Sequence, residues 1–164
     1  MPKQRPDPQR SLVGFQVGDV AYAVPIAVVR EIINPVPLTE LPHAPAPVAG
    51  VADHRGEVVP VIDLRVRFGM PPRKLEDRSK WILVDVEGRI VGLAVDNVTE
   101  VFGTGGEELR PPPELGSGDE LRGIAGVTNH WGQLIFVLDV GRFEPLTTAM
   151  EHAGMLDRLS QGVS

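Results

Sequence analysis

GVADHRGEVVPVIDLRVRF, residues 50–68, is the stretch from which the fold of this chain can be read. A short apolar piece leads into a polar turn at Gly56, and a long apolar run follows. This order predicts a β-hairpin followed by a core strand. Pro60 lies inside the apolar run, so one side of its strand is expected to be a sheet edge or a bulge there. Arg55 stands at the turn, where folding does not obviously require an arginine, and it is therefore a candidate site residue.

The same pattern returns as GVTNHWGQLIFVLDVGRF, residues 126–143. Both copies have a glycine at the start, a histidine before the turn, a glycine in the turn and an aspartate after the apolar run. The matching pairs are Gly50 and Gly126, His54 and His130, Gly56 and Gly132, and Asp63 and Asp139, preceded in the same order by Glu31 and Glu100. These matches predict an internal duplication.

Alternating apolar residues predict further strands before each hairpin. A segment that fits both helix and strand, residues 26–33, is expected to form a helical turn after Pro25 and then a strand from about Val28. Connections are expected where prolines and polar residues gather, at 34–47 and 70–80. The other expected strands are two within 12–24, then 81–86, 89–95 and 98–102.

Each half therefore holds about five short strands, a number typical of a small β-barrel. Because one half alone buries little apolar surface, we expect an all-β fold in which two five-stranded barrels share a hydrophobic core, with a ligand groove between them. The expected organisation is a disordered leader at 1–10, a folded domain at 11–145 and a C-terminal helix and tail at 146–164. The first barrel is placed at about 11–70 and the second at about 81–145, with an exchange of strands between them left open.

The composition narrows the class of protein. The formal net charge of −6 argues against nucleic acid as the main ligand, because phosphate binding favours a basic surface. The absence of cysteine excludes disulfides and thiolate chemistry. No apolar run approaches the roughly 20 residues that span a bilayer, and residues 1–10 do not resemble a signal peptide. The sequence predicts a soluble cytoplasmic protein without direct membrane insertion.

The sequence shows no nucleophile elbow, phosphate-binding loop or HExxH helix. His54 and His130, with Asp53 and Asn129 beside them, could bind a metal only if the two hairpins converged, so we expect them to be polar residues that lead into turns. Asp63 and Asp139 could form an acid–base pair, but the duplication favours acceptors of backbone N–H groups at strand ends. We predict no enzyme activity, no metal and no cofactor.

Arg55 differs from its neighbours because its counterpart in the second copy is Trp131, so the fold does not require an arginine at this position. A guanidinium on a rigid turn suits bidentate pairing with a carboxylate or with carbonyl groups of a partner. The alternative is a solvated turn arginine.

RGEVVPVIDLRVRFG, residues 55–69, resembles the RGxxxPVxDLRxxFG signature of the CheW family of chemotaxis coupling proteins. Val29-Arg30-Glu31-Ile32 is similar to the family's V-x-E-I segment, and residues 109–113, LRPPP, to the stretch before its last hairpin. The resemblance covers about residues 11–145 and implies two five-stranded SH3-like β-barrels on a common core. One departure is Asp53-His54, where the family usually has Asn-Leu.

The resemblance also implies a function, that of an adaptor in a chemosensory array. Family members link the cytoplasmic tips of methyl-accepting chemoreceptors to the regulatory domain of the histidine kinase CheA. By similarity, Val29, Glu31 and Gly50 are expected to bind the kinase, and Arg55 to couple receptor and kinase. The alternatives are an adaptor of a non-flagellar chemosensory pathway, a generic β-barrel peptide binder, and a small hydrolase that uses Asp53 and His54.

Overall fold

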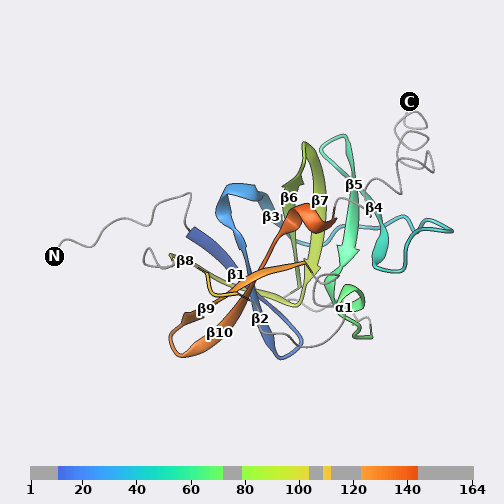
Figure 1. The fold of residues 1–164 in the computed structure, drawn as a ribbon. Helices are drawn as coiled ribbons and strands as arrows, with labels where there is room; N and C mark the ends of the chain where they lie inside the picture. Colours follow the sequence, from blue (N-terminus) through green and yellow to red (C-terminus); the bar gives the residue numbers. More distant parts are fainter. Residues whose placement is uncertain (1–10, 72–78, 104–108, 112–122, 144–164) are drawn as a thin grey trace.

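The computed structural model describes residues 11–71, 79–103, 109–111 and 123–143, which form two five-stranded β-sheets (Figure 1). The expected all-β fold is thereby confirmed, whereas the expected leader and C-terminal helix lie outside the described residues. The strands are β1 (Ser11–Val17), β2 (Val20–Pro25), β3 (Val29–Ile33), β4 (Val48–His54), β5 (Glu57–Asp63), β6 (Lys80–Val86), β7 (Arg89–Val95), β8 (Asn97–Gly103), β9 (Ile124–His130) and β10 (Gln133–Leu138). Three short helical segments are η1 (Ile26–Val28), α1 (Leu64–Arg67) and η2 (Val140–Phe143), and no helix in the described ranges is long and apolar enough to cross a membrane.

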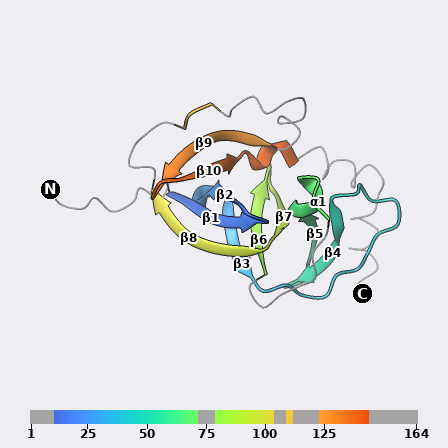
Figure 2. The same ribbon diagram turned by 90° about the horizontal axis from the view of Figure 1, so that it is seen from below.

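The two sheets exchange strands. Sheet A has the order β8-β1-β2-β10-β9, and sheet B has the order β3-β6-β7-β5-β4 (Figure 2). The first hairpin of the chain, β1–β2, therefore joins the last three strands, and the first hairpin of the second copy, β6–β7, joins β3, β4 and β5. Neither sheet is built from residues 11–70 or 81–145 alone. The exchange is reciprocal, as expected when a duplicated unit gives its first hairpin to its twin.

The exchanged hairpins have both faces buried. In β1, Val13, Phe15 and Val17 belong to the core shared by the two sheets, whereas Leu12 faces the interior of sheet A. In β6 and β7 the same alternation separates shared-core residues from those inside sheet B, which include Trp81. Strands with two buried faces read as nearly continuous apolar runs. The shared core predicted from the short length of each half is therefore confirmed.

Hydrogen bonds at two strand ends follow the prediction for Asp63 and Asp139. Asp63 Oδ1 accepts a hydrogen bond from Arg65 N at 2.9 Å, and Asp139 Oδ1 accepts one from Gly141 N at 3.0 Å. The aspartate ends β5 and begins α1 because its side chain satisfies an N–H group that a first helical turn leaves without a partner. The apolar run that continues to Phe68 is therefore not one strand, and α1 was not predicted.

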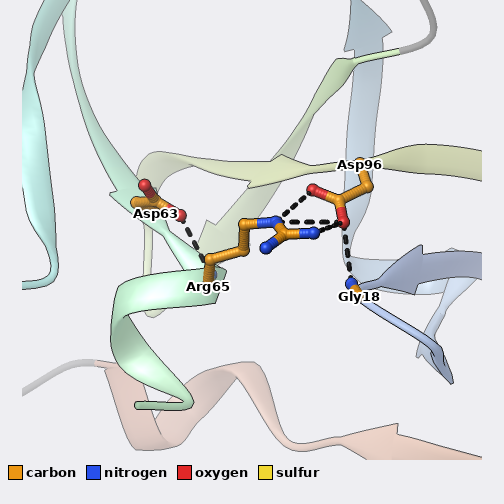
Figure 3. A network of polar contacts seen from close by, with 4 residues as sticks. All are labelled: Gly18, Asp63, Arg65 and Asp96. Carbon is orange, nitrogen blue, oxygen red and sulfur yellow. Dashed lines mark hydrogen bonds and ion pairs between the residues drawn. The ribbon is translucent and has the colours of Figure 1, made fainter. Parts of the chain in front are cut away.

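A polar joint connects the two sheets at Asp96, between β7 and β8 (Figure 3). Arg65 of α1 donates to both Asp96 oxygens, with Nε 2.9 Å from Oδ1 and Nη2 2.7 Å from Oδ2. Gly18 N, in the β1–β2 turn, donates to Oδ2 at 2.7 Å. Asp96 thus holds a helix of sheet B and a turn of sheet A at the point where the chain passes from one sheet to the other.

Candidate functional site

The turn that carries Arg55 has a fixed shape. Arg55 and Gly56 are its two central residues, and their φ angles are 53° and 82°. These angles match a type I′ turn, whose backbone twist fits the twist of the two strands of a hairpin. Asp53 Oδ1 accepts a hydrogen bond from Gly56 N at 3.1 Å and holds the turn closed. Trp131 occupies the same position in the second hairpin, with φ 54°. The two turns therefore hold their first central residue in the same conformation, and the two hairpins differ in whether that residue is an arginine or a tryptophan.

Glu31, on β3, is bound by two residues of the β4–β5 hairpin. Arg55 Nη2 donates to Glu31 Oε1 at 2.9 Å, and His54 Nε2 lies 3.1 Å from Oε2. The side chain of Arg55 is 74% exposed, that of Glu31 32% and that of His54 21%. The structure thus brings together Glu31 and Arg55, which the resemblance assigned to kinase binding and to coupling. Arg55 is largely exposed to solvent and is also paired with Glu31.

The histidine–glutamate contact occurs in both barrels and joins the two edges of each sheet. β3 and β4 are the edge strands of sheet B, and β8 and β9 are those of sheet A. Glu31 and His54 connect the first pair of edges, and Glu100 and His130 connect the second at 2.9 Å. This contact was not predicted, although both residues of the pair recur in the duplication. Their joint recurrence was the sequence signal for it.

A hollow of about 250 Å³ opens beside this cluster. Its apolar lining comes from Leu83 and Ile90, and its charged lining from Arg30, Glu31, His54, Arg55 and Glu57. A hollow lined by both apolar and charged side chains suits the anchoring of one side chain of a protein partner. The predicted groove between the two barrels is a different place and stays a prediction.

The arrangement does not favour catalysis. Asp53 bonds the turn and His54 contacts Glu31, so the two residues proposed for a small hydrolase have separate partners. Among the described residues, no group of three or more His, Cys, Asp or Glu side chains could hold a metal ion.

Val29 and Gly50 lie deeper than Arg55. Val29 is partly buried and packs against the shared core. Gly50 is buried, and a Cβ built on it would lie 2.5 Å from the carbonyl oxygen of Thr39. That close approach lets the proline-rich connection pair with β4, because Thr39 and Val51 exchange backbone hydrogen bonds of 2.8 and 2.9 Å. Gly126 has the equivalent position beside Arg110.

We expect Gly50→Ala to lower the free energy of unfolding by about 1–3 kcal/mol, because the added methyl group meets backbone that cannot move without breaking the bridge to Thr39. Gly126→Ala is the matched variant and should cost less, because its added methyl group would lie 2.8 Å from Leu109 Cβ and 3.0 Å from the Arg110 carbonyl oxygen. Urea unfolding followed by circular dichroism measures both. A Gly50→Ala chain of unchanged stability would show that the glycine is not needed for this approach of the loop.

Comparison with known proteins places the chain within one family. The family model for the CheW-like domain matches residues 11–144. Chemotaxis protein CheW of Rhizobium meliloti (strain 1021) is 36% identical over 136 residues, which cover 83% of this chain and 88% of that protein. Protein FrzA of Myxococcus xanthus is 32% identical over 76% of this chain and 78% of its own length. The crystal structure of scaffolding protein TtCheW from Thermoanaerobacter tengcongensis superposes with a TM-score of 0.72 at 28% identity, covering 80% of this chain and 89% of that one.

Proposed function

Because this chain belongs to the CheW family and is therefore a chemotaxis adaptor rather than an enzyme, we propose that it couples methyl-accepting chemoreceptors to a CheA-type histidine kinase. The observation that carries the proposal is the cluster of Glu31, His54 and Arg55 beside the hollow of sheet B. Glu31 and Arg55 are the residues assigned by the resemblance to kinase binding and to coupling, and they form one hydrogen-bonded unit.

The kinase-binding surface of this proposal is the end of sheet B. Glu31 contacts the kinase directly, and Arg55, which lies in the adjoining turn, takes part in coupling the receptor to the kinase. Val29 packs against the shared core, and Gly50 leaves room for the proline-rich connection. Both residues therefore contribute mainly to the shape of the kinase-binding surface. The coupling is geometric: the adaptor holds two partners in a fixed relation, in the cytoplasm beside the membrane receptors. Contacts of modest affinity suffice in an array, because many linked copies raise the effective concentration.

A second candidate is an adaptor of a non-flagellar chemosensory pathway. The relatives with names other than CheW support it: Protein FrzA is 32% identical, and Protein PilI of Pseudomonas aeruginosa is 30% identical over 152 residues. The fold and the site are the same for both candidates, and they differ in which receptor and kinase bind.

The proposal is tested by equilibrium binding of the purified chain to the CheA regulatory domain and to the receptor's cytoplasmic tip from its own organism. We expect micromolar or tighter binding to the kinase domain, and a complex of all three proteins when the receptor tip is added. A folded chain that binds neither partner at protein concentrations of about 100 μM refutes the proposal, because that would correspond to less than about 5.5 kcal/mol of binding free energy.

A further inference from the structure

We propose that His54 is a positioning residue of the coupling surface, which orients the Glu31 carboxylate so that Glu31 and Arg55 meet the kinase in one geometry. The inference rests on the proposed function and deepens it. Its starting point is the division of the carboxylate: His54 holds Oε2 at 3.1 Å, and Arg55 holds Oε1 at 2.9 Å. Each oxygen therefore has its own donor.

Burial distinguishes the two donors. The side chain of His54 is 21% exposed, whereas that of Arg55 is 74% exposed on its turn. A partly buried ring with two side-chain torsions fixes its partner better than a long exposed side chain, which loses more conformational freedom on ordering. His54 is thus the more rigid support, and Arg55 is the group that remains accessible to a partner.

The second barrel shows what the histidine does without an arginine. His130 holds Glu100 at 2.9 Å and stacks on Phe102, with ring centroids 4.1 Å apart. Trp131 replaces Arg55 there, lies edge-on to His130 and is 88% exposed. The histidine–glutamate pair alone is therefore a feature of both halves of this chain that joins two sheet edges. In sheet B the same pair also places a carboxylate against an exposed guanidinium, which links the fold to the site.

Removal of His54 should leave the carboxylate with more than one arrangement. The other charged groups that line the hollow are Arg30 from β3 and Glu57 from β5, while β6 and β7 contribute only Leu83 and Ile90. Arg30 would then compete with Arg55 for Glu31, and Glu57 would repel it. Binding would have to select one arrangement out of several, which weakens the apparent affinity.

The test uses titration calorimetry with the CheA regulatory domain as the probe and compares His54→Leu, His54→Gln and the matched His130→Leu. We expect His54→Leu to raise Kd about fivefold, which corresponds to about 1 kcal/mol, the net effect of losing one ordinary, partly exposed hydrogen bond. His54→Gln keeps an N–H donor and should bind within about twofold of the unmodified chain, and His130→Leu should do so as well. In a Glu31→Ala background the further effect of His54→Leu should fall below about twofold, because coupled residues are not additive.

The inference is overturned if His54→Leu, shown by circular dichroism to be folded, binds as tightly as the unmodified chain. It is also overturned if His54→Leu weakens binding equally with and without Glu31, or if His54→Gln fails to restore it. Loss of binding by Arg55→Ala together with unaffected binding by His54→Leu would leave the proposed function standing and remove only this inference. An unmodified chain without affinity for the kinase domain would refute both.

Discussion

Arg65→Ala is expected to lower the free energy of unfolding by about 3 kcal/mol, at the lower end of the range for removing one partner of a buried ion pair. Both side chains of the pair are 15% exposed, and Asp96 would remain in the joint with only part of its hydrogen bonds. The loss should destabilise both sheets, because Asp96 lies where the chain passes from sheet B to sheet A. Urea unfolding followed by circular dichroism measures it.

Two further variants identify the cause. Arg65→Lys should recover less than half of the loss, since an ammonium group cannot reproduce the paired Nε and Nη2 contacts with Asp96. Arg142→Ala removes an arginine whose ion pair with Asp139 is long, at 3.8 Å, and about half exposed, so its ion pair should contribute at most about 1 kcal/mol. An Arg65→Ala protein as stable as Arg142→Ala would contradict the role of the joint.

Arg55→Ala is expected to have the opposite profile, with a change in stability of about 1 kcal/mol or less and a loss of kinase-domain affinity of about thirtyfold. The effect on folding should be small because the side chain is exposed. The equivalent turn of the second hairpin also forms with Trp131 in this position, so the turn does not require an arginine. The large effect on binding follows because an exposed arginine held against Glu31 is a preformed hydrogen-bonding group beside a hollow. Titration calorimetry with the CheA regulatory domain gives the affinity.

The matched comparison is Arg142→Ala, an exposed arginine outside the cluster, which should bind within about twofold of the unmodified chain. Arg55→Lys should give an intermediate affinity, because it keeps the charge and loses the planar fork. If Arg55→Ala and Arg142→Ala bound equally well, the coupling surface would have to be sought elsewhere on the molecule.

Local patterns in the sequence predicted most of the fold. Strands recognised by alternation around Gly18, Gly56, Gly88 and Gly132 are present, as is the helical turn after Pro25. These features depend on residues a few positions apart, so the sequence carries their signal directly. The duplication predicted the two sheets and the shared core, because two equal halves that each bury little apolar surface must pack on each other.

The exchange of hairpins and the Arg65–Asp96 joint could not be read from the sequence. Both depend on which strands meet in space, and an apolar strand buried on two faces fits either sheet equally well. In the sequence, Arg65 lies within the family signature, and Asp96 lies between the strands expected at 89–95 and 98–102. The two residues form an ion pair because the fold brings α1 beside the β7–β8 connection, and no local sequence pattern predicts that approach.

The site was predicted in part. The arginine without a counterpart identified the turn, and the resemblance supplied Glu31, but nothing in the sequence predicted that the two side chains bond. His54 was expected to be structural because it recurs as His130. Its contact with Glu31 agrees with that expectation, and the further role proposed for it comes from Arg55 on the other carboxylate oxygen.

The central claim is that the Glu31–Arg55 end of sheet B couples receptor to kinase. The most direct measurement is autophosphorylation of the cognate CheA-type kinase with its receptor in vesicles, supplemented with equal amounts of the unmodified chain or of Arg55→Ala. We predict that the unmodified chain raises kinase activity and makes it respond to receptor ligand, and that Arg55→Ala gives about a tenth or less of that increase, because the variant binds the kinase domain more weakly. Equal kinase control by the two proteins, at equal folded concentration, would contradict the account.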